Sequence, residues 1–352
     1  MSKIVNKALF YKEWINVRWV TILTIIVLLF FKVYGVISQL NFNKKFMEEQ
    51  GKVWTDRWFN NGLHARDHTY FIIMIFVVII LATILFIGEK TSETEGFIAS
   101  MPFTRQEIIF NKWIIGVLSL LICFIVTYIF LSIFYFANVS GLDTTLNPYS
   151  DIVRWFFMDT SQYICIFTFI ILIQAVMGNS IVSSIVGGIA LLVPWFITMI
   201  AQDLVMRYYG FDEYLSIVFD KVGGWLNIYS YNTTSFNWVN IKTNSGKDTY
   251  RSYYYLNYKL KLLVLFVLTC LFLYLAYVAY KRKNLEYNLR LVVFKNLKPV
   301  FIYSVSICSG LFGGSVFTNG SLRLFGISFI IFTIVGYFIS KLLLKILSSK
   351  SN

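Results

Sequence analysis

Long apolar runs recur along the whole chain and are separated by polar segments. They lie at 19–38, 70–88, 113–137, 160–178, 181–201, 259–280, 300–317 and 323–345. Each run is close to the length of about 20 residues that an α-helix needs to cross the hydrocarbon core of a bilayer. The pattern therefore predicts an all-α polytopic membrane protein with about eight transmembrane helices.

Glycine and proline positions predict local geometry within these runs. The residues at 178–180, Gly-Asn-Ser, separate the fourth and fifth runs and predict a tight turn between two helices. The glycine pair at 187–188, followed by Pro194, predicts a kink in the fifth span. The glycine-rich stretch 310–314 in the seventh span predicts close packing against another helix.

The net positive charge of the chain bears on its orientation in the membrane. The chain is 57% hydrophobic and 14% charged, with a formal net charge of +13. In a soluble protein that charge suggests a nucleic acid, but here we expect no nucleic-acid partner, because the basic residues concentrate in segments expected to be cytoplasmic. The clearest case is the basic linker 281–299. This distribution predicts cytoplasmic termini, outer loops at 39–69 and 202–258, and contact with anionic lipid.

The N-terminal segment 1–18 has a helical pattern of its own. Its apolar residues recur at Leu9, Phe10, Trp14 and Val17, with charged residues between them. This pattern predicts an amphipathic helix that lies in the inner interface before the first span. The alternative is that it simply extends that span.

The sequence lacks the motifs of an enzyme. It contains no G-x-x-x-x-G-K-[ST] phosphate loop, no H-E-x-x-H and no G-x-S-x-G. We therefore predict no catalytic residue, no cofactor, and ATP hydrolysis only in a separate subunit. The four cysteines all lie in apolar runs, where they are interpreted as inert packing residues.

A few polar residues are candidates for special roles. His64 and His68 have the spacing of a helical metal pair, but with only these two ligands no metal site is predicted. Lys32 is expected to extend outward along the first span, the alternative being a contact with a substrate headgroup. Asp159 is expected at a span end. Only Gln174 and Lys32 then remain as strongly polar groups inside spans, too few for an ion-driven carrier.

The polar segment between the second and third spans carries two helix-start signals. Ser92 and Glu95 have the spacing of a capping box, as do Thr104 and Glu107, and Pro102 lies between the two pairs. The segment predicts a short helix, a tight turn and the start of a new helix. A capped helix in this place indicates a surface for a partner.

This segment resembles the coupling helix of the ABC-2 type permeases. The matching positions are Glu93, Gly96, Phe97, Ser100, Pro102, Arg105, Glu107 and Lys112. The resemblance extends over roughly residues 1–280 and implies that 89–112 docks on a cytoplasmic ABC ATPase subunit. Glu95 and Phe97 would meet that subunit, whereas we expect Lys112 to meet lipid. The resemblance also implies pairing with a second copy or a related permease.

The implied organisation has four parts. They are an interfacial helix at 1–18, a six-helix ABC-2-like core at 19–280, the linker 281–299, and two further spans with a short cytoplasmic tail at 300–352. The function implied is that of a permease subunit of a bacterial plasma-membrane transporter. We expect it to export an amphipathic peptide, lipid or cell-wall compound. The alternative is a non-transporting scaffold or sensor subunit of a resistance or signalling complex. The aromatic loop 202–258 forms either an interfacial belt or an outward mouth.

Overall fold

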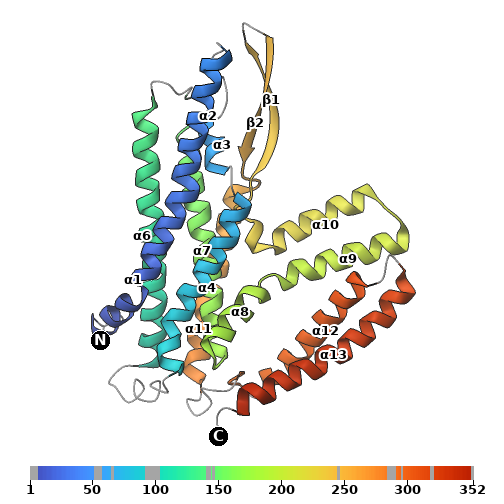
Figure 1. Ribbon diagram of the computed structural model, residues 1–352. Helices are drawn as coiled ribbons and strands as arrows, with labels where there is room; N and C mark the ends of the chain where they lie inside the picture. The colour runs from blue at the N-terminus through green and yellow to red at the C-terminus, as the bar shows by residue number, and fades with distance from the viewer. Residues whose placement is uncertain are drawn as a thin grey trace. The chain divides into compact units, whose positions relative to one another are not determined.

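The computed structural model describes residues 7–50, 58–64, 67–91, 104–139, 144, 147–243, 246–283, 291–294, 296–317 and 321–349. Figure 1 shows that these residues are mostly helical. The helices are α1 (Lys7–Leu28), the π-helix η1 (Leu29–Val33), α2 (Tyr34–Gln50), α3 (Trp58–His64), α4 (Asp67–Thr91), α6 (Arg105–Ala137), α7 (Ser150–Val176), α8 (Ser180–Ala190), α9 (Val193–Tyr209), α10 (Glu213–Leu226), the 3-10 helix η3 (Ile228–Ser230), α11 (Tyr258–Arg282), α12 (Leu297–Val316) and α13 (Leu322–Ser349). The strands are β1 (Ser235–Thr243) and β2 (Gly246–Tyr254).

The predicted fold class is confirmed. Within the described part of the chain, 8 helical spans are long and apolar enough to cross a membrane. The fourth span begins at Ser150 rather than at residue 160, because α7 opens with several polar residues that lower the local hydropathy. Between α8 and α9 the helix breaks at Leu191, before Pro194, which confirms the predicted kink.

The segment 202–258 has more structure than a loop. It contains the end of α9, the helix α10, and an antiparallel hairpin in which Ser235 pairs with Tyr254. Asp212 caps α10 by accepting hydrogen bonds from the backbone of its first turn. Exposed aromatic rings are frequent here. The most exposed are Tyr208, Tyr209, Phe211 and Tyr214.

The described chain divides into two compact units. The first unit comprises residues 1–81, 111–167 and 232–271, and the second comprises 82–110, 168–231 and 272–352. The helices α4, α6, α7 and α11 contribute residues to both units.

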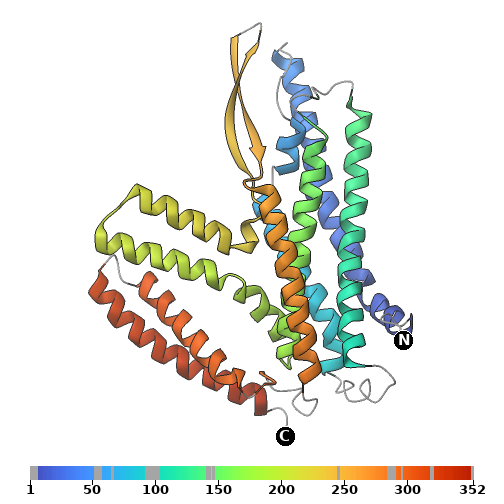
Figure 2. The same ribbon diagram turned by 180° about the vertical axis from the view of Figure 1, so that it is seen from behind.

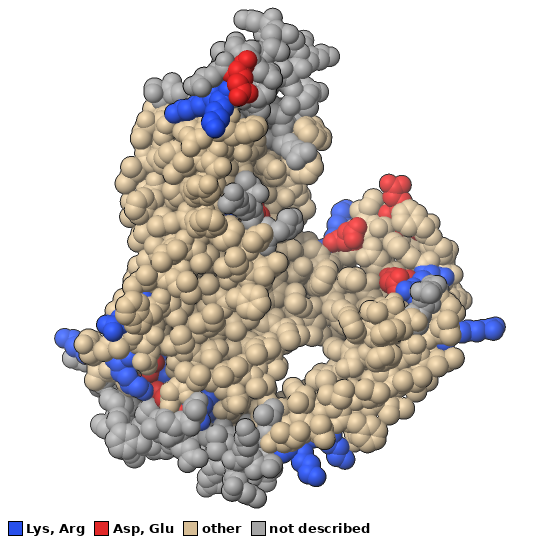
Figure 3. All heavy atoms as spheres, viewed as in Figure 1, with Lys and Arg blue, Asp and Glu red and all other residues tan. Residues whose placement is uncertain are grey.

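In the first unit, α1 is apolar on both faces. One face, which includes Val17, Val20 and Leu28, is buried, while the opposite face exposes large side chains such as Trp19 and Ile26. A helix that buries one apolar face and exposes another is typical of a span that packs on protein and faces lipid. Figure 3 shows a broad surface without charge along this unit, between charged groups near its two ends.

The N-terminal segment continues directly into the first span. α1 runs without interruption from Lys7, although its first turns lie at an angle to the rest of the helix (Figure 1). The predicted position of these turns in the membrane interface stays a prediction.

In the second unit, the turn predicted between the fourth and fifth spans is present. α7 ends at Val176, and Asn179 caps the start of α8 by accepting a hydrogen bond from the backbone N–H of Val182 at 3.1 Å. α11 lies beside α7 (Figure 2), where the rings of Phe169 and Phe272 meet with their centroids 4.9 Å apart.

The helices α12 and α13 form a closely packed pair in the same unit. A Cβ atom added at Gly310 would lie 2.0 Å from Thr333 Oγ1, and one added at Gly313 would lie 2.2 Å from the ring of Phe332. Only glycine leaves room for these neighbours, so the prediction of close packing at 310–314 is confirmed.

Candidate functional site

The start of α6 carries the second predicted helix cap. The Glu107 carboxylate accepts a hydrogen bond from the Thr104 backbone N–H at 2.9 Å, and the Thr104 hydroxyl accepts one from the Glu107 N–H at 3.2 Å. This reciprocal pair is the predicted capping box. Six of the predicted coupling residues lie outside the described part of the chain. They are Glu93, Glu95, Gly96, Phe97, Ser100 and Pro102.

On the other side of that segment, the last turn of α4 is anchored by Lys90. The buried ammonium of Lys90 donates to Gln174 Oε1 at 2.6 Å, to the Gln174 carbonyl at 2.8 Å and to the Met177 carbonyl at 2.8 Å. An ammonium has three donors, so these contacts use all of them. Carbonyls at a helix C-terminus lack partners within the helix, and a cation there is stabilising. Lys90 therefore fastens the end of α4 to the end of α7.

The side chain of Gln174 extends this network to the next helix. Its amide nitrogen donates to the Ser180 carbonyl and to the Ser184 hydroxyl, both at 2.7 Å. The Ser180 hydroxyl in turn donates to the Thr83 carbonyl of α4 at 3.0 Å. Buried hydrogen bonds thus connect the ends of α4 and α7 with the beginning of α8. They fix the relative positions of these helix ends, because breaking one would leave a buried polar group without a hydrogen-bond partner.

Two further contacts connect the neighbouring polar segments of the second unit. Arg105, in the first turn of α6, donates to the Lys283 carbonyl just after α11 at 2.5 Å. Met177 forms an antiparallel bridge with Val292, and both are buried in a small apolar cluster. Arg105, Glu107 and Lys112 are the matching positions that the structure describes, and Arg105 connects the start of α6 to the residue that follows α11.

The predicted lipid contact of Lys112 is wrong. In the first unit, the Lys112 ammonium is buried and lies 2.8 Å from the Glu13 carboxylate, which is also buried. This pair joins α6 to α1. The Glu13 carboxylate lies within reach of Lys112, and the ion pair with it takes the place of the expected extension to the membrane surface.

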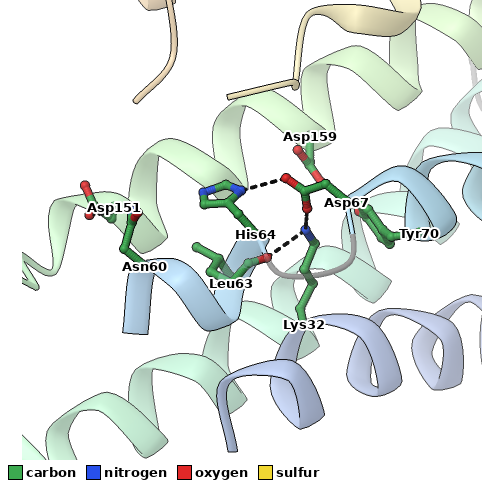
Figure 4. Close-up of polar contacts among 8 residues, drawn as sticks. All are labelled: Lys32, Asn60, Leu63, His64, Asp67, Tyr70, Asp151 and Asp159. Carbon is green, nitrogen blue, oxygen red and sulfur yellow. Dashed lines mark hydrogen bonds and ion pairs between the residues drawn. The ribbon is translucent and has the colours of Figure 1, made fainter. Parts of the chain in front are cut away.

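The expectation for Lys32 is also wrong, as Figure 4 shows. Lys32 lies in the π-helix η1, and its side chain is only 2% exposed. The ammonium donates to Asp67 Oδ1 at 2.6 Å and to the Leu63 carbonyl at 3.0 Å, and it lies 4.1 Å from the centre of the Tyr70 ring. A π-turn shifts the side chains that follow it around the helix, and here it accompanies an inward-facing lysine. Lys32 is thus held within the protein by a carboxylate and a π face.

His64 completes this ion-paired group. Its Nδ1 lies 2.8 Å from Asp67 Oδ2, so one carboxylate binds both Lys32 and His64. Burial alone would raise the pKa of Asp67, but its interactions with Lys32 and His64 outweigh burial and lower the pKa from 3.8 to about 2. Asp67 therefore stays ionised at neutral pH. Its contribution to stability is present above about pH 4 and is lost as the pH falls toward 2.

Asp159 does not lie at a span end. It is buried within the span Ser150–Val176 and accepts a hydrogen bond from the Tyr70 hydroxyl at 2.7 Å. The interpretation that carboxylates are confined to span ends is wrong, because the span begins earlier than the hydropathy suggests. The polar residues of α3, α4, α7 and η1 gather into one buried group.

The two histidines are not a helical metal pair. His64 ends α3, whereas His68 belongs to α4, so the i,i+4 spacing does not place them on one helix. In the described part of the chain, no group of three or more His, Cys, Asp or Glu side chains is arranged to hold a metal ion.

The spans and their buried ion pairs define a polytopic membrane protein. The family described as ABC-2 family transporter protein matches residues 8–285, which run from α1 to just beyond α11. The chain belongs to this family and is a permease of an ABC transporter, a component that associates with an ATP-binding subunit. No curated protein and no solved structure matches the chain. The match leaves α12 and α13 outside the family core.

Proposed function

We propose that this chain is the transmembrane subunit of an exporter driven by a separate ATP-hydrolysing subunit. The observation that carries the proposal is the anchoring on both sides of the segment between α4 and α6. Lys90 holds the end of α4, and Arg105 holds the start of α6. A partner bound to the intervening segment would therefore act on two helices that are fastened to the rest of the second unit.

The anchors suggest how movement of the segment would spread. Displacement of the end of α4 would pull on the end of α7 through Lys90 and on the start of α8 through Gln174. Displacement of α6 would act on the end of α11 through Arg105. Packed helices change arrangement as rigid elements, so hydrogen-bonded ends are suitable points for transmitting such a change.

The expected substrate is an amphipathic peptide, lipid or cell-wall compound. The exposed aromatic rings of α9, α10 and the hairpin support this choice, since such rings bind molecules with one apolar and one polar part. In the proposed assembly, the permease pairs with a second copy or a related permease in a bacterial plasma membrane and contacts anionic lipid through its basic segments.

The proposal requires the segment 89–112 and the linker 281–299 to face the cytoplasm, where ATP is present. We predict that a cysteine replacing Asn284 is labelled by an impermeant maleimide only in inverted vesicles. A cysteine replacing Ser245 should be labelled only in intact cells. Both replacements are made in a chain whose Cys270 and Cys308 are alanine, because these two thiols are at least partly exposed. Labelling of both new cysteines from one side would contradict the topology and the proposed function with it.

A further inference from the structure

We propose that the first unit contains a binding pocket for the primary ammonium group of an amphipathic molecule. A small pocket lies between α3, the start of α7 and the end of the hairpin. It is lined by Asn60, His64, Asp151, Arg154, Tyr253, Tyr254 and Tyr255. Its inner wall adjoins the ion-paired group of Figure 4, in which His64 binds Asp67.

Asn60, one of the residues that line this pocket, carries a buried acceptor. Its side chain is 2% exposed, and its Nδ2 donates to Asp151 Oδ2 at 2.8 Å. A carboxylate can only accept, so this contact fixes which way the amide of Asn60 is turned. Its Oδ1 is buried and has no hydrogen-bond partner among the residues that the structure describes. A buried acceptor without a donor is unfavourable, and a ligand with N–H groups would satisfy it.

Tyr255 presents a second unpaired group. Its hydroxyl is buried, and within the described part of the chain it has no hydrogen-bond partner. The centroid of its ring lies 5.8 Å from that of His64, and the ring of Tyr253 lies at the same distance from the imidazole. Aromatic faces and unpaired oxygens in one pocket suit an ammonium group, which gains from both.

The electrostatic environment is negative. Burial raises the pKa of Tyr255, and the charges of Asp159, Asp67 and Asp151 raise it further. Lys32 is paired with Asp67 at 2.6 Å, and Arg154, which lies 4.0 Å from Asp151, is 54% exposed to solvent. The three carboxylates therefore outnumber these two basic side chains. A pocket with an excess of carboxylates favours a cation over an anion.

This inference extends the proposed function, because it predicts that the exported molecule carries a primary amine. It rests on the proposed function only in treating the bound molecule as the transported substrate. Binding requires neither ATP nor the partner subunit. Failure of the binding test would leave the permease proposal in place, whereas failure of the topology test would leave the pocket in place.

The test uses the full chain in nanodiscs of zwitterionic lipid, with n-octylammonium and n-octyltrimethylammonium as probes. Titration calorimetry, corrected with empty nanodiscs, should show saturable binding of octylammonium at one site per chain. The trimethyl probe carries the same charge but has no N–H donor, so it should bind at least about tenfold more weakly.

The decisive variant is Tyr255→Phe, which removes only a hydroxyl that has no hydrogen-bond partner among the described residues. It should fold normally and bind octylammonium at least about tenfold more weakly. Tyr274→Phe, the same change at an exposed ring of α11, is the matched control and should bind as the unaltered chain does. Equal binding of the two probes, or unchanged octylammonium binding by Tyr255→Phe, would overturn the inference.

Discussion

Replacement of Lys32 by methionine is expected to destabilise the protein by about 3 kcal/mol or more, the usual cost of removing one partner of a buried ion pair. Methionine has a similar length, but it leaves the Asp67 carboxylate in contact with His64 and without the Lys32 ammonium, and it removes the charge from the Tyr70 ring. We expect a clear fall in the free energy of unfolding measured by titration with sodium dodecyl sulfate.

A double-mutant cycle separates the ion pair from the loss of packing. Asp67→Asn combined with Lys32→Met should recover part of the loss, because neither partner is then left charged and unpaired. The single changes should together cost more than the double change. If the costs simply add, the 2.6 Å contact between Lys32 and Asp67 contributes no coupling and the description of this buried group is wrong.

Replacement of Lys90 by methionine is expected to have the second large effect. It removes three hydrogen bonds from a charged donor and leaves two backbone carbonyls and one amide oxygen without that donor. Each hydrogen bond to a charged group contributes about 1.5–3 kcal/mol, although the three do not add fully. The permease should still assemble with its ATP-binding subunit, but substrate should no longer stimulate ATP hydrolysis, because the end of α4 is released from α7.

The matched control is Lys281→Met, which removes an exposed lysine from the last turn of α11. It should leave both assembly and stimulation unchanged. Unaltered stimulation in Lys90→Met, measured on the purified complex, would show that the anchored end of α4 has no part in coupling.

Much of the fold could be predicted from the sequence, because membrane spans depend on local hydropathy. The break at 178–180 and the tight packing at 310–314 follow from glycine and its neighbours within a few residues. The hairpin was not predicted, although the polar turn residues at 244–246 between two β-branched and aromatic stretches are a recognised signal for one.

The buried ion pairs could not be predicted in the same way. Lys32 and Asp67 lie 35 positions apart, and Glu13 and Lys112 lie 99 apart, so no local pattern connects them. Each lysine in isolation looks like one that extends to the membrane surface. The position of Asp159 within a span was not predicted, because α7 begins at Ser150 with several polar residues. Hydropathy alone assigns such residues to the end of a span.

The most direct test of the proposed function concerns Phe97. Truncating a buried interface aromatic costs about 2 kcal/mol or more, so Phe97→Ala should weaken association with the ATP-binding subunit and lower substrate-stimulated hydrolysis together. Phe338→Ala, which alters an exposed ring of α13, is the control, and Glu95→Gln should be mild because glutamine can still cap a helix.

The measurement is co-purification of the permease with the ATP-binding subunit, followed by the hydrolysis rate of the isolated complex with and without substrate. The account predicts that Phe97→Ala is inserted normally and loses both association and stimulation, while Phe338→Ala retains them. Full association and stimulation in Phe97→Ala, and also in Glu95→Ala, would contradict the claim that this segment couples the permease to ATP hydrolysis.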